Sequence, residues 1–184
     1  METLTWPVAQ PTLTAGGLML RPWRESDADA VHTACQDPEI VRWTRIPFPY
    51  ERQHAADFVG PLSANAWAHK TAANFAVVDS DGTLVGSFGL VRMNPPQSVA
   101  EVGYWVAPAA RRRGVAHRAA AAVTTWALRD VGFARIELLA AAENAGSRRV
   151  AEQIGFTQEG VLRSAAAGRG AREDLVLYSR IASD

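Results

Sequence analysis

The sequence has very little cysteine. Its one cysteine, Cys35, rules out an intramolecular disulfide, and no CxxC or Cys/His cluster suggests a zinc site. Nothing near Cys35 in the sequence would lower the pKa of its thiol, so we expect a packed helix residue rather than a nucleophile. The chain is therefore expected to work without a bound metal or a cysteine nucleophile.

Long hydrophobic runs are also missing. No stretch approaches the roughly 20 apolar residues that span a bilayer. Residues 1–17 have neither the basic start nor the continuous apolar core of a signal peptide. We therefore expect a cytoplasmic protein with no membrane partner.

An excess of either charge is absent too. Lysine plus arginine and aspartate plus glutamate each number 19 in a chain of 184 residues. Proteins that bind nucleic acid or membrane surfaces normally carry a basic excess, so the balance argues against both classes while allowing one local basic site. The length suits one domain with a core, and 48% hydrophobic and 21% charged residues are ordinary for a globular protein.

Hydrophobic periodicity and turn signals predict a single α+β domain. Residues 1–16 are predicted to form an extended arm, and residues 17–184 the domain. Strands are predicted at 17–23, 73–79, 83–93, 99–107, 134–141, 156–165 and 173–181. Helices are predicted at 26–36, 51–62, 114–131 and 147–154, and 39–50 is predicted to be a turn followed by a proline-rich loop.

The most unusual stretch is "ARRRGVA", in which three consecutive arginines precede Gly114. It lies between a predicted strand and a predicted helix. The backbone N–H groups of residues 112–116 therefore fall at a helix N-terminus, where they lack helix acceptors and attract phosphate. Gly114 lets the backbone approach a ligand without a Cβ, and Ala116 keeps the first turn uncrowded. A solvated loop without a ligand is the alternative, although cations at a helix N-terminus oppose the helix dipole.

The segment from Arg111 to Ala116 has the pattern R-x-x-G-x-A. This pattern resembles the acetyl-coenzyme A loop, Q/R-x-x-G-x-G/A, of the GNAT N-acetyltransferase superfamily. Further segments are similar, in the same order, to the RimJ/RimL-like branch that acetylates ribosomal-protein N-termini. These segments are "LMLRPWRESDADAV" (18–31), "AEVGYWVAP" (100–108), "ARIELLAAAENAGSRRVAEQIGFTQEGVLR" (134–163) and "REDLVLYSRI" (172–181).

The resemblance implies a GNAT-like fold, with a mixed, mostly antiparallel sheet splayed in a V and helices on both faces. The pantetheine of acetyl-coenzyme A would enter between two parallel strands, 99–106 and 134–140. The acetyl group would pass directly to a primary amine in a ternary complex, without an acyl-enzyme. Homodimers are common in this branch. Cofactor contacts are implied for Trp105, Val106, Arg111, Arg112, Arg113, Gly114, Val115, Ala116, His117, Asn144 and Ser147.

Such a reaction needs an unprotonated amine, a donor for the oxyanion and a proton for the departing thiolate. Glu101 matches an acidic position of the branch and lies on the face of its strand opposite Tyr104, so it is the candidate base or an exposed strand carboxylate. Ser147 is the candidate acid toward the thiolate, or it caps the helix at 148–154, or it does both. Asn144 would bond the pantetheine or a strand end, or form an Asx-turn.

Two positions depart from the family pattern. The branch often follows the glycine loop with Thr/Ser-Glu-Ala, whereas this chain has His117-Arg118-Ala119, which places the pyrophosphate geometry in doubt. Many GNAT enzymes carry a tyrosine four residues before a Gly-Phe pair, and this chain has Ala151 there. The oxyanion donor would be a backbone N–H near residues 105–106.

The acceptor amine would enter beside a region that holds Trp43, Phe48, Tyr50 and Trp67. Aromatic residues are also ordinary core material. We predict a protein or peptide N-terminus as the acceptor, which requires an open acidic groove. A small-molecule amine, such as an antibiotic or a metabolite, would require a closed aromatic pocket. A module that binds acetyl-coenzyme A without turnover is the third hypothesis, and the presence of both Glu101 and Ser147 argues against it.

Overall fold

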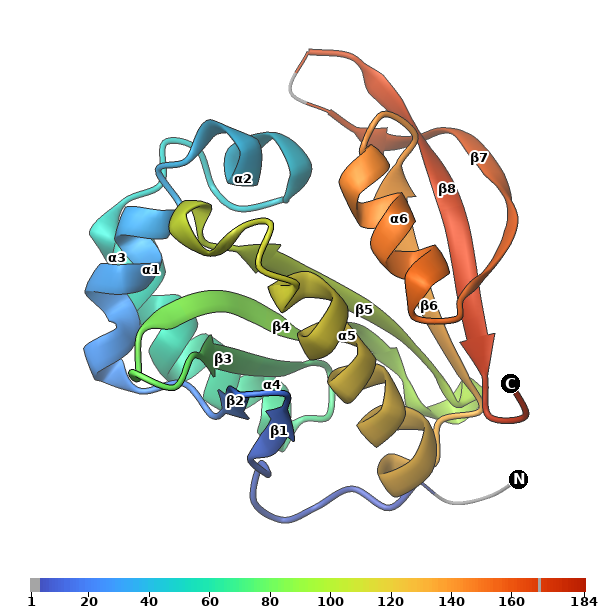
Figure 1. Ribbon diagram of the computed structural model, residues 1–184, viewed down its shortest axis with the longest axis horizontal. Coiled ribbons are helices and arrows are strands. Elements are labelled where there is room, and N and C mark those ends of the chain that lie inside the picture. Colours follow the sequence, from blue (N-terminus) through green and yellow to red (C-terminus); the bar gives the residue numbers. More distant parts are fainter. Residues whose placement is uncertain (1–3, 169) are drawn as a thin grey trace.

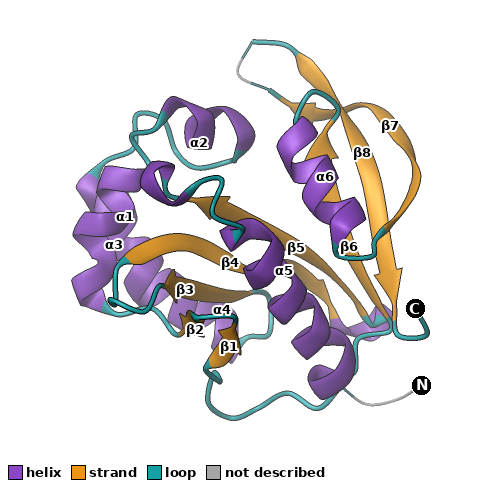
Figure 2. Cartoon of the chain, in the orientation of Figure 1, coloured by secondary structure: helices purple, strands orange, loops and turns teal. Residues whose placement is uncertain are grey.

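The computed structural model describes residues 4–168 and 170–184, and within them one eight-stranded sheet carries six α-helices (Figures 1 and 2). The strands follow the order β1-β2-β3-β4-β5-β6-β8-β7 across the sheet. They are β1 (Leu13–Ala15), β2 (Leu18–Arg21), β3 (Ala73–Val78), β4 (Leu84–Asn94), β5 (Val99–Val106), β6 (Arg135–Ala141), β7 (Thr157–Ala167) and β8 (Arg172–Ile181). The helices are α1 (Ala28–Ala34), α2 (Pro38–Trp43), α3 (Arg52–Asp57), α4 (Ser63–Ala68), α5 (Val115–Trp126) and α6 (Ala145–Gln153).

Helices cover both faces of the sheet, as the resemblance implies. On one face α5 buries the stripe predicted for it, Val115, Ala119, Val123 and Trp126, in the larger apolar cluster. On the other face α1, α2 and α3 bury a second cluster, to which the sheet contributes Trp105. Successive side chains of a strand point to opposite faces, so Trp105 can join the second cluster while its neighbours on β5 join the first.

The sheet splays between β5 and β6. All other neighbouring strands are antiparallel, but β5 and β6 are parallel and pair at only three positions, Val99 with Arg135, Ala100 with Ile136 and Glu101 with Glu137. Beyond these pairs the strands diverge, and Figure 1 shows β6, β7, β8 and α6 turning away from the rest of the sheet. The mixed, V-shaped sheet predicted from the sequence is therefore confirmed.

The region from residue 26 to residue 50 differs from the prediction. The helix expected at 26–36 begins only at Ala28, because a 3-10 turn, Glu25–Asp27, precedes it; Asp27, rather than Ser26, accepts from the backbone amide of Arg24 in that turn. The loop expected at 39–50 is wrong in its first part, which forms α2. Asp37 caps this helix by accepting from two backbone amides, and a proline is well tolerated in the first helical turn.

The two longer predicted helices are also shorter than expected. The helix predicted at 51–62 ends at Asp57, because Gly60 has non-helical torsions and Pro61 follows it; α4 then continues the chain. The helix predicted at 114–131 ends at Trp126 and continues as a π turn to Val131. Single 3-10 or π turns occupy Glu25–Asp27, Phe58–Leu62, Pro95–Gln97, Pro108–Ala110 and Ala127–Val131.

The described part of the predicted N-terminal arm packs along the domain. Its last residues form β1, which pairs with β2 at the edge of the sheet. Trp6 lies against Trp67 and Trp126, with ring centroids 4.3 Å and 6.0 Å away. Among the described residues, no helix combines the length and the apolar character needed to cross a membrane.

Candidate active site at the divergence of two strands

The gap between β5 and β6 exposes backbone groups that a closed sheet would pair. Ala107 donates from its amide to the carbonyl of Val85, 2.9 Å away, so odd-numbered residues at this end of β5 face β4. Hydrogen bonding alternates along an antiparallel strand, and the amide of Val106 therefore points to the side that β6 has left. Of the two predicted oxyanion donors, Val106 has a suitable direction, whereas the backbone of Trp105 belongs to the β4 ladder.

The loop after β5 leads directly into α5, as predicted. Gly114 precedes the helix with φ of 70°, a left-handed conformation that favours glycine, and Arg112 has φ of 62°. Within the described residues, the backbone amides of residues 112–114 donate to no other backbone group. The amides of the first turn of α5 also lack helix acceptors. This cluster of N–H groups, together with the positive end of the helix dipole, suits a phosphate.

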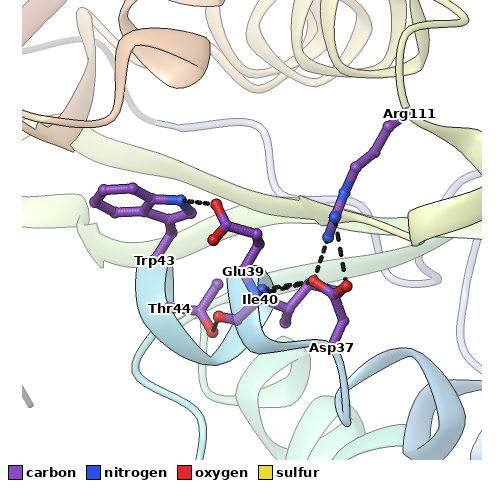
Figure 3. Close-up of polar contacts among 6 residues, drawn as sticks. All are labelled: Asp37, Glu39, Ile40, Trp43, Thr44 and Arg111. Atoms are coloured by element: carbon purple, nitrogen blue, oxygen red, sulfur yellow. Dashed lines mark hydrogen bonds and ion pairs between the residues drawn. The ribbon is translucent and has the colours of Figure 1, made fainter.

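The three arginines of the loop have different environments. Arg111 does not extend toward the amides; it pairs with Asp37, with an Nη2–Oδ1 distance of 2.5 Å (Figure 3). Burial opposes ionisation of Asp37, but hydrogen bonds from Arg111 and from the amides that Asp37 caps outweigh it and lower its pKa. Arg113 lies 3.7 Å from Asp79, and exposed Arg112 forms no ion pair among the described residues. Arg112 and Arg113 are thus the better placed of the three for an added anion.

Arg118, one of the departures from the family pattern, donates hydrogen bonds to the carbonyl groups of the loop. Its Nη2 donates to the carbonyl of Arg113 at 3.0 Å and its Nε to that of Gly114 at 3.3 Å. Its Nη1 also donates to the carbonyl of Gly16 in the β1–β2 turn. Arg118 therefore satisfies loop carbonyls while the loop amides stay available. The neighbouring His117 is exposed on the first turn of α5, and Val115 is buried in the core.

The structure brings Ser147 and Asn144 together at the start of α6, but with a different division of roles. Asn144 is the N-cap, and its Oδ1 accepts from the amide of Ser147 at 3.0 Å. The alternative that Ser147 caps the helix is therefore wrong, and its hydroxyl is free for another partner. That partner is Tyr104 of β5, whose Oη lies 3.1 Å from Ser147 Oγ across the gap. Position 151 of α6 holds a fully buried alanine, whose methyl group offers no hydroxyl.

Glu101 lies on the other face of the sheet from Tyr104 and Ser147. Its Oε2 accepts from both Nε, at 2.7 Å, and Nη2 of Arg92. Its Oε1 has no hydrogen-bond partner among the described residues, and the side chain borders an open pocket of about 650 Å³. The pocket is lined by Thr71, Arg92, Met93, Asn94, Gln97, Val99, Ala100, Glu101 and Glu137. The two predicted catalytic side chains therefore lie on opposite faces of the sheet, Glu101 at the last β5–β6 pair and Ser147 across the gap from Tyr104.

Two of the four aromatic residues expected around the acceptor belong to the core. Tyr50 is buried in the second apolar cluster, and Trp67 is buried in the first one. Trp43 is half-buried on α2, and Phe48 is exposed. Cys35 is buried as predicted; burial raises the pKa of its thiol to about 11, against a smaller lowering by its bond with Tyr50. No group of three His, Cys, Asp or Glu side chains in the described part of the chain could hold a metal ion.

Comparisons with known proteins agree with this geometry. The family model described as the acetyltransferase (GNAT) domain matches residues 17–157. YdaF of Bacillus subtilis is 35% identical over 99 residues, which are 54% of this chain and 54% of that protein. The ribosomal-protein-serine acetyltransferase of Escherichia coli is 26% identical over 137 residues, covering 74% of this chain and 76% of the relative.

Solved structures add the fold. The ribosomal L7/L12 α-N-protein acetyltransferase RimL, in complex with coenzyme A, superposes with a TM-score of 0.86 at 20% identity, over 93% of this chain and 98% of that one. At that identity the likeness establishes the fold alone, whereas the family model spans most of the chain. The protein is therefore a member of the GNAT acetyltransferase family, an N-acetyltransferase family whose co-substrate is acetyl-coenzyme A.

Proposed function

We propose that this protein transfers an acetyl group from acetyl-coenzyme A directly to the α-amino group of a protein or peptide N-terminus. The observation that carries the proposal is the open pocket on the Glu101 face, which has two carboxylates, Glu101 and Glu137, beside the strand divergence. Each pairs with one arginine, Glu101 with Arg92 and Glu137 with Arg135, and Glu101 keeps one carboxylate oxygen unpartnered toward the pocket. An N-terminal ammonium is attracted to such an oxygen. The burial of Tyr50 and Trp67 speaks against the closed aromatic pocket that a small-molecule acceptor would need.

The residues present fit the co-substrate. Acetyl-coenzyme A would supply the acetyl group as an activated thioester. The amides of residues 112–116, with Arg112 and Arg113, would hold its phosphates. The Oδ1 of Asn144 caps α6, so its side-chain NH₂ would be the group that donates to the pantetheine. His117 adds a donor on the same turn.

The catalytic groups would divide the proton transfers between the two faces. Glu101 would take the proton that the amine loses, because its Oε1 is unpartnered and borders the pocket. The amide of Val106 would donate to the carbonyl oxygen as negative charge develops on it. Ser147 would donate to the departing sulfur from the opposite face. As the C–N bond forms and the C–S bond breaks, Glu101 would take one proton from the amine and Ser147 would give one to the sulfur; solvent would then remove the proton from Glu101 and return one to Ser147, so the step balances.

The phosphate site is tested by titration calorimetry of acetyl-coenzyme A into the wild type and Gly114→Trp. We expect micromolar binding by the wild type and its loss in Gly114→Trp, because the side chain would cover the loop amides. Gly132→Trp is the matched control: Gly132 also has positive φ, 88°, but follows the other end of the α5 segment. Equal loss in both variants, or no binding by a folded wild type, would remove the basis of the proposal.

The acceptor class is tested with paired substrates. One peptide carries a free α-amine, the same peptide carries a blocked N-terminus and a free lysine, and a polyamine represents the small molecules. Preferential acetylation of the free α-amine is expected. Faster turnover of the polyamine would assign the protein to small-molecule acetylation instead. A ribosomal acceptor would also place the enzyme in the cytoplasm. The resemblance implies a homodimer as well, and light scattering would measure the oligomeric state.

A further inference from the structure

Tyr104 occupies a position in the site that the sequence did not single out. Its ring stacks on Phe88 of β4, with centroids 4.8 Å apart and an interplanar angle of 5°. This contact fixes the ring on the face of β5 that carries α5 and α6. The only hydrogen bond of its Oη within the described residues is to Ser147, 43 positions away in the sequence. The stacked ring of Tyr104 therefore places its hydroxyl next to Ser147, across the gap between β5 and β6.

Ser147 depends on this contact for its orientation. Its amide is held by Asn144, so the backbone of the residue is fixed, but its Oγ has no other partner among the described residues. Ser147 lies in the first turn of α6, so no preceding turn of the helix offers its hydroxyl a carbonyl. The bond to Tyr104 therefore holds Oγ toward the gap.

The protonation state of Tyr104 decides whether the phenol can donate in this bond, in which either hydroxyl can be the donor. Burial raises the pKa of Tyr104 to about 12, against a smaller lowering by its bond with Ser147. The phenol therefore keeps its proton wherever an amine acceptor can react. When Tyr104 donates this proton to Ser147 Oγ, the hydrogen of Ser147 is left for a third group. A hydroxyl that accepts a hydrogen bond is also a stronger donor.

We propose that Tyr104 is a positioning residue for Ser147, which it orients and polarises so that the serine hydroxyl donates to the sulfur of coenzyme A. The proposal rests on the proposed function, since it assumes that the sulfur lies in the gap. It assigns the phenol of β5 to the same proton path as the α6 hydroxyl. Tyr104 itself makes no contact with the reacting atoms in this arrangement.

Two measurements test the proposal with Tyr104→Phe, Ser147→Ala and the double variant. In steady-state kinetics, Tyr104→Phe is expected to lower kcat about three- to tenfold and leave KM for acetyl-coenzyme A within about twofold. The double variant should be no slower than Ser147→Ala, because Tyr104 acts only through Ser147. In the second measurement, the thiol of bound coenzyme A is titrated by its ultraviolet absorbance. Ser147→Ala should move its deprotonation to higher pH, and Tyr104→Phe should move it in the same direction by less.

Tyr178→Phe is the control for a purely structural effect. Tyr178 is fully buried, and its hydroxyl contacts Arg148 and Glu152 of α6 without touching Ser147. It should alter stability but neither kcat nor the thiol titration. Equal effects of the two phenylalanine variants, or multiplicative effects in the double variant, would overturn the proposal. A wild type that binds coenzyme A but acetylates no amine would refute the proposed function, while the thiol titration would still decide the role of Tyr104. Absence of coenzyme A binding would refute both.

Discussion

The closed and open ends of the V are held by different kinds of interaction. At the closed end, β5 and β6 share a backbone ladder, and Ile136 is fully buried beneath it. Arg135 adds ion pairs to Glu137 at 2.8 Å and to Glu159 at 2.5 Å. Hydrogen bonds from Arg135 and Ser179 lower the pKa of Glu159 to about 2. Backbone pairing, apolar burial and charge therefore act on the same few residues.

The V has two arms, the sheet from β1 to β5 and the sheet formed by β6, β8 and β7. At the open end, the described contacts between these two arms are made by side chains. Tyr104 reaches Ser147 across the gap. An ion pair joins α2 or its N-cap to each arm: Asp37 pairs with Arg111 after β5, and Arg42 pairs with Glu143 after β6 at 2.9 Å. Each of these contacts can be removed by one substitution without unpairing a strand. The ladder that stabilises the sheet and the side-chain contacts that a single substitution can remove are thus located at opposite ends of one pair of strands.

The comparison predicts its largest effect at the closed end. Ile136→Ala removes a fully buried side chain beside the ladder and should cost about 3 kcal/mol in the free energy of unfolding. For a chain of this length, the melting temperature should fall by about 6–12 °C. Val161→Ala on β7 is the control, because Val161 is half exposed, and it should change stability by less than about 0.5 kcal/mol. Similar losses in the two variants would show that the closed end is not the stabilising region.

A smaller effect is expected where α2 meets the loop after β5. Asp37→Ala removes both the cap of α2 and the pair with Arg111, and should lower the free energy of unfolding by about 1–2 kcal/mol. Asp37→Asn keeps a good capping residue and removes only the charge, so it should stay within about 0.5 kcal/mol of the wild type. Urea unfolding of both variants separates the two roles. An equal loss in both would mean that the ion pair, and not the cap, holds α2.

Local patterns in the sequence were sufficient to predict the strand, loop and helix around Gly114. A strand, a short loop with Gly114 and a helix are consecutive, so their order alone places the amides of residues 112–116 at a helix N-terminus. The alternation along β5 likewise predicts that Tyr104 and Glu101 face opposite sides. Both inferences depend on neighbouring residues and on fixed periodicities, and the structure agrees with both.

The parts that could not be predicted depend on long-range contacts. Arg111 was expected to bind phosphate, but its partner Asp37 lies 74 positions away. Ser147 and Asn144 are both good capping residues three positions apart, and only the geometry of α6 assigns the cap to Asn144. The hydroxyl contact of Tyr104 with Ser147 requires knowledge of how far the two arms diverge. Sequence periodicity contains no such distance.

The smallest effect on stability should come from the ion pair between Arg42 and Glu143 at the open end of the V. Arg42 and Glu143 are exposed, with side-chain exposures of 52% and 79%, and ion pairs of this kind contribute about 0–1 kcal/mol. Arg42→Ala should therefore leave the melting temperature nearly unchanged. Its guanidinium also lies 4.2 Å from the ring centroid of Trp43, one of the aromatic residues predicted to lie beside the acceptor, so loss of the contact should loosen α2 there.

The effect of Arg42→Ala on enzyme kinetics distinguishes the open end of the V from its closed end. We expect Arg42→Ala to raise KM for a peptide acceptor about two- to threefold and to leave KM for acetyl-coenzyme A unchanged. Glu143→Ala should do the same, and the double variant should add nothing, because both substitutions remove one contact. The charge-swapped pair, Arg42→Glu with Glu143→Arg, should recover part of the loss. If Arg42→Ala instead lowers the free energy of unfolding as much as Ile136→Ala does, the open end also stabilises the sheet. The two ends of the V would then not differ in their contribution to stability.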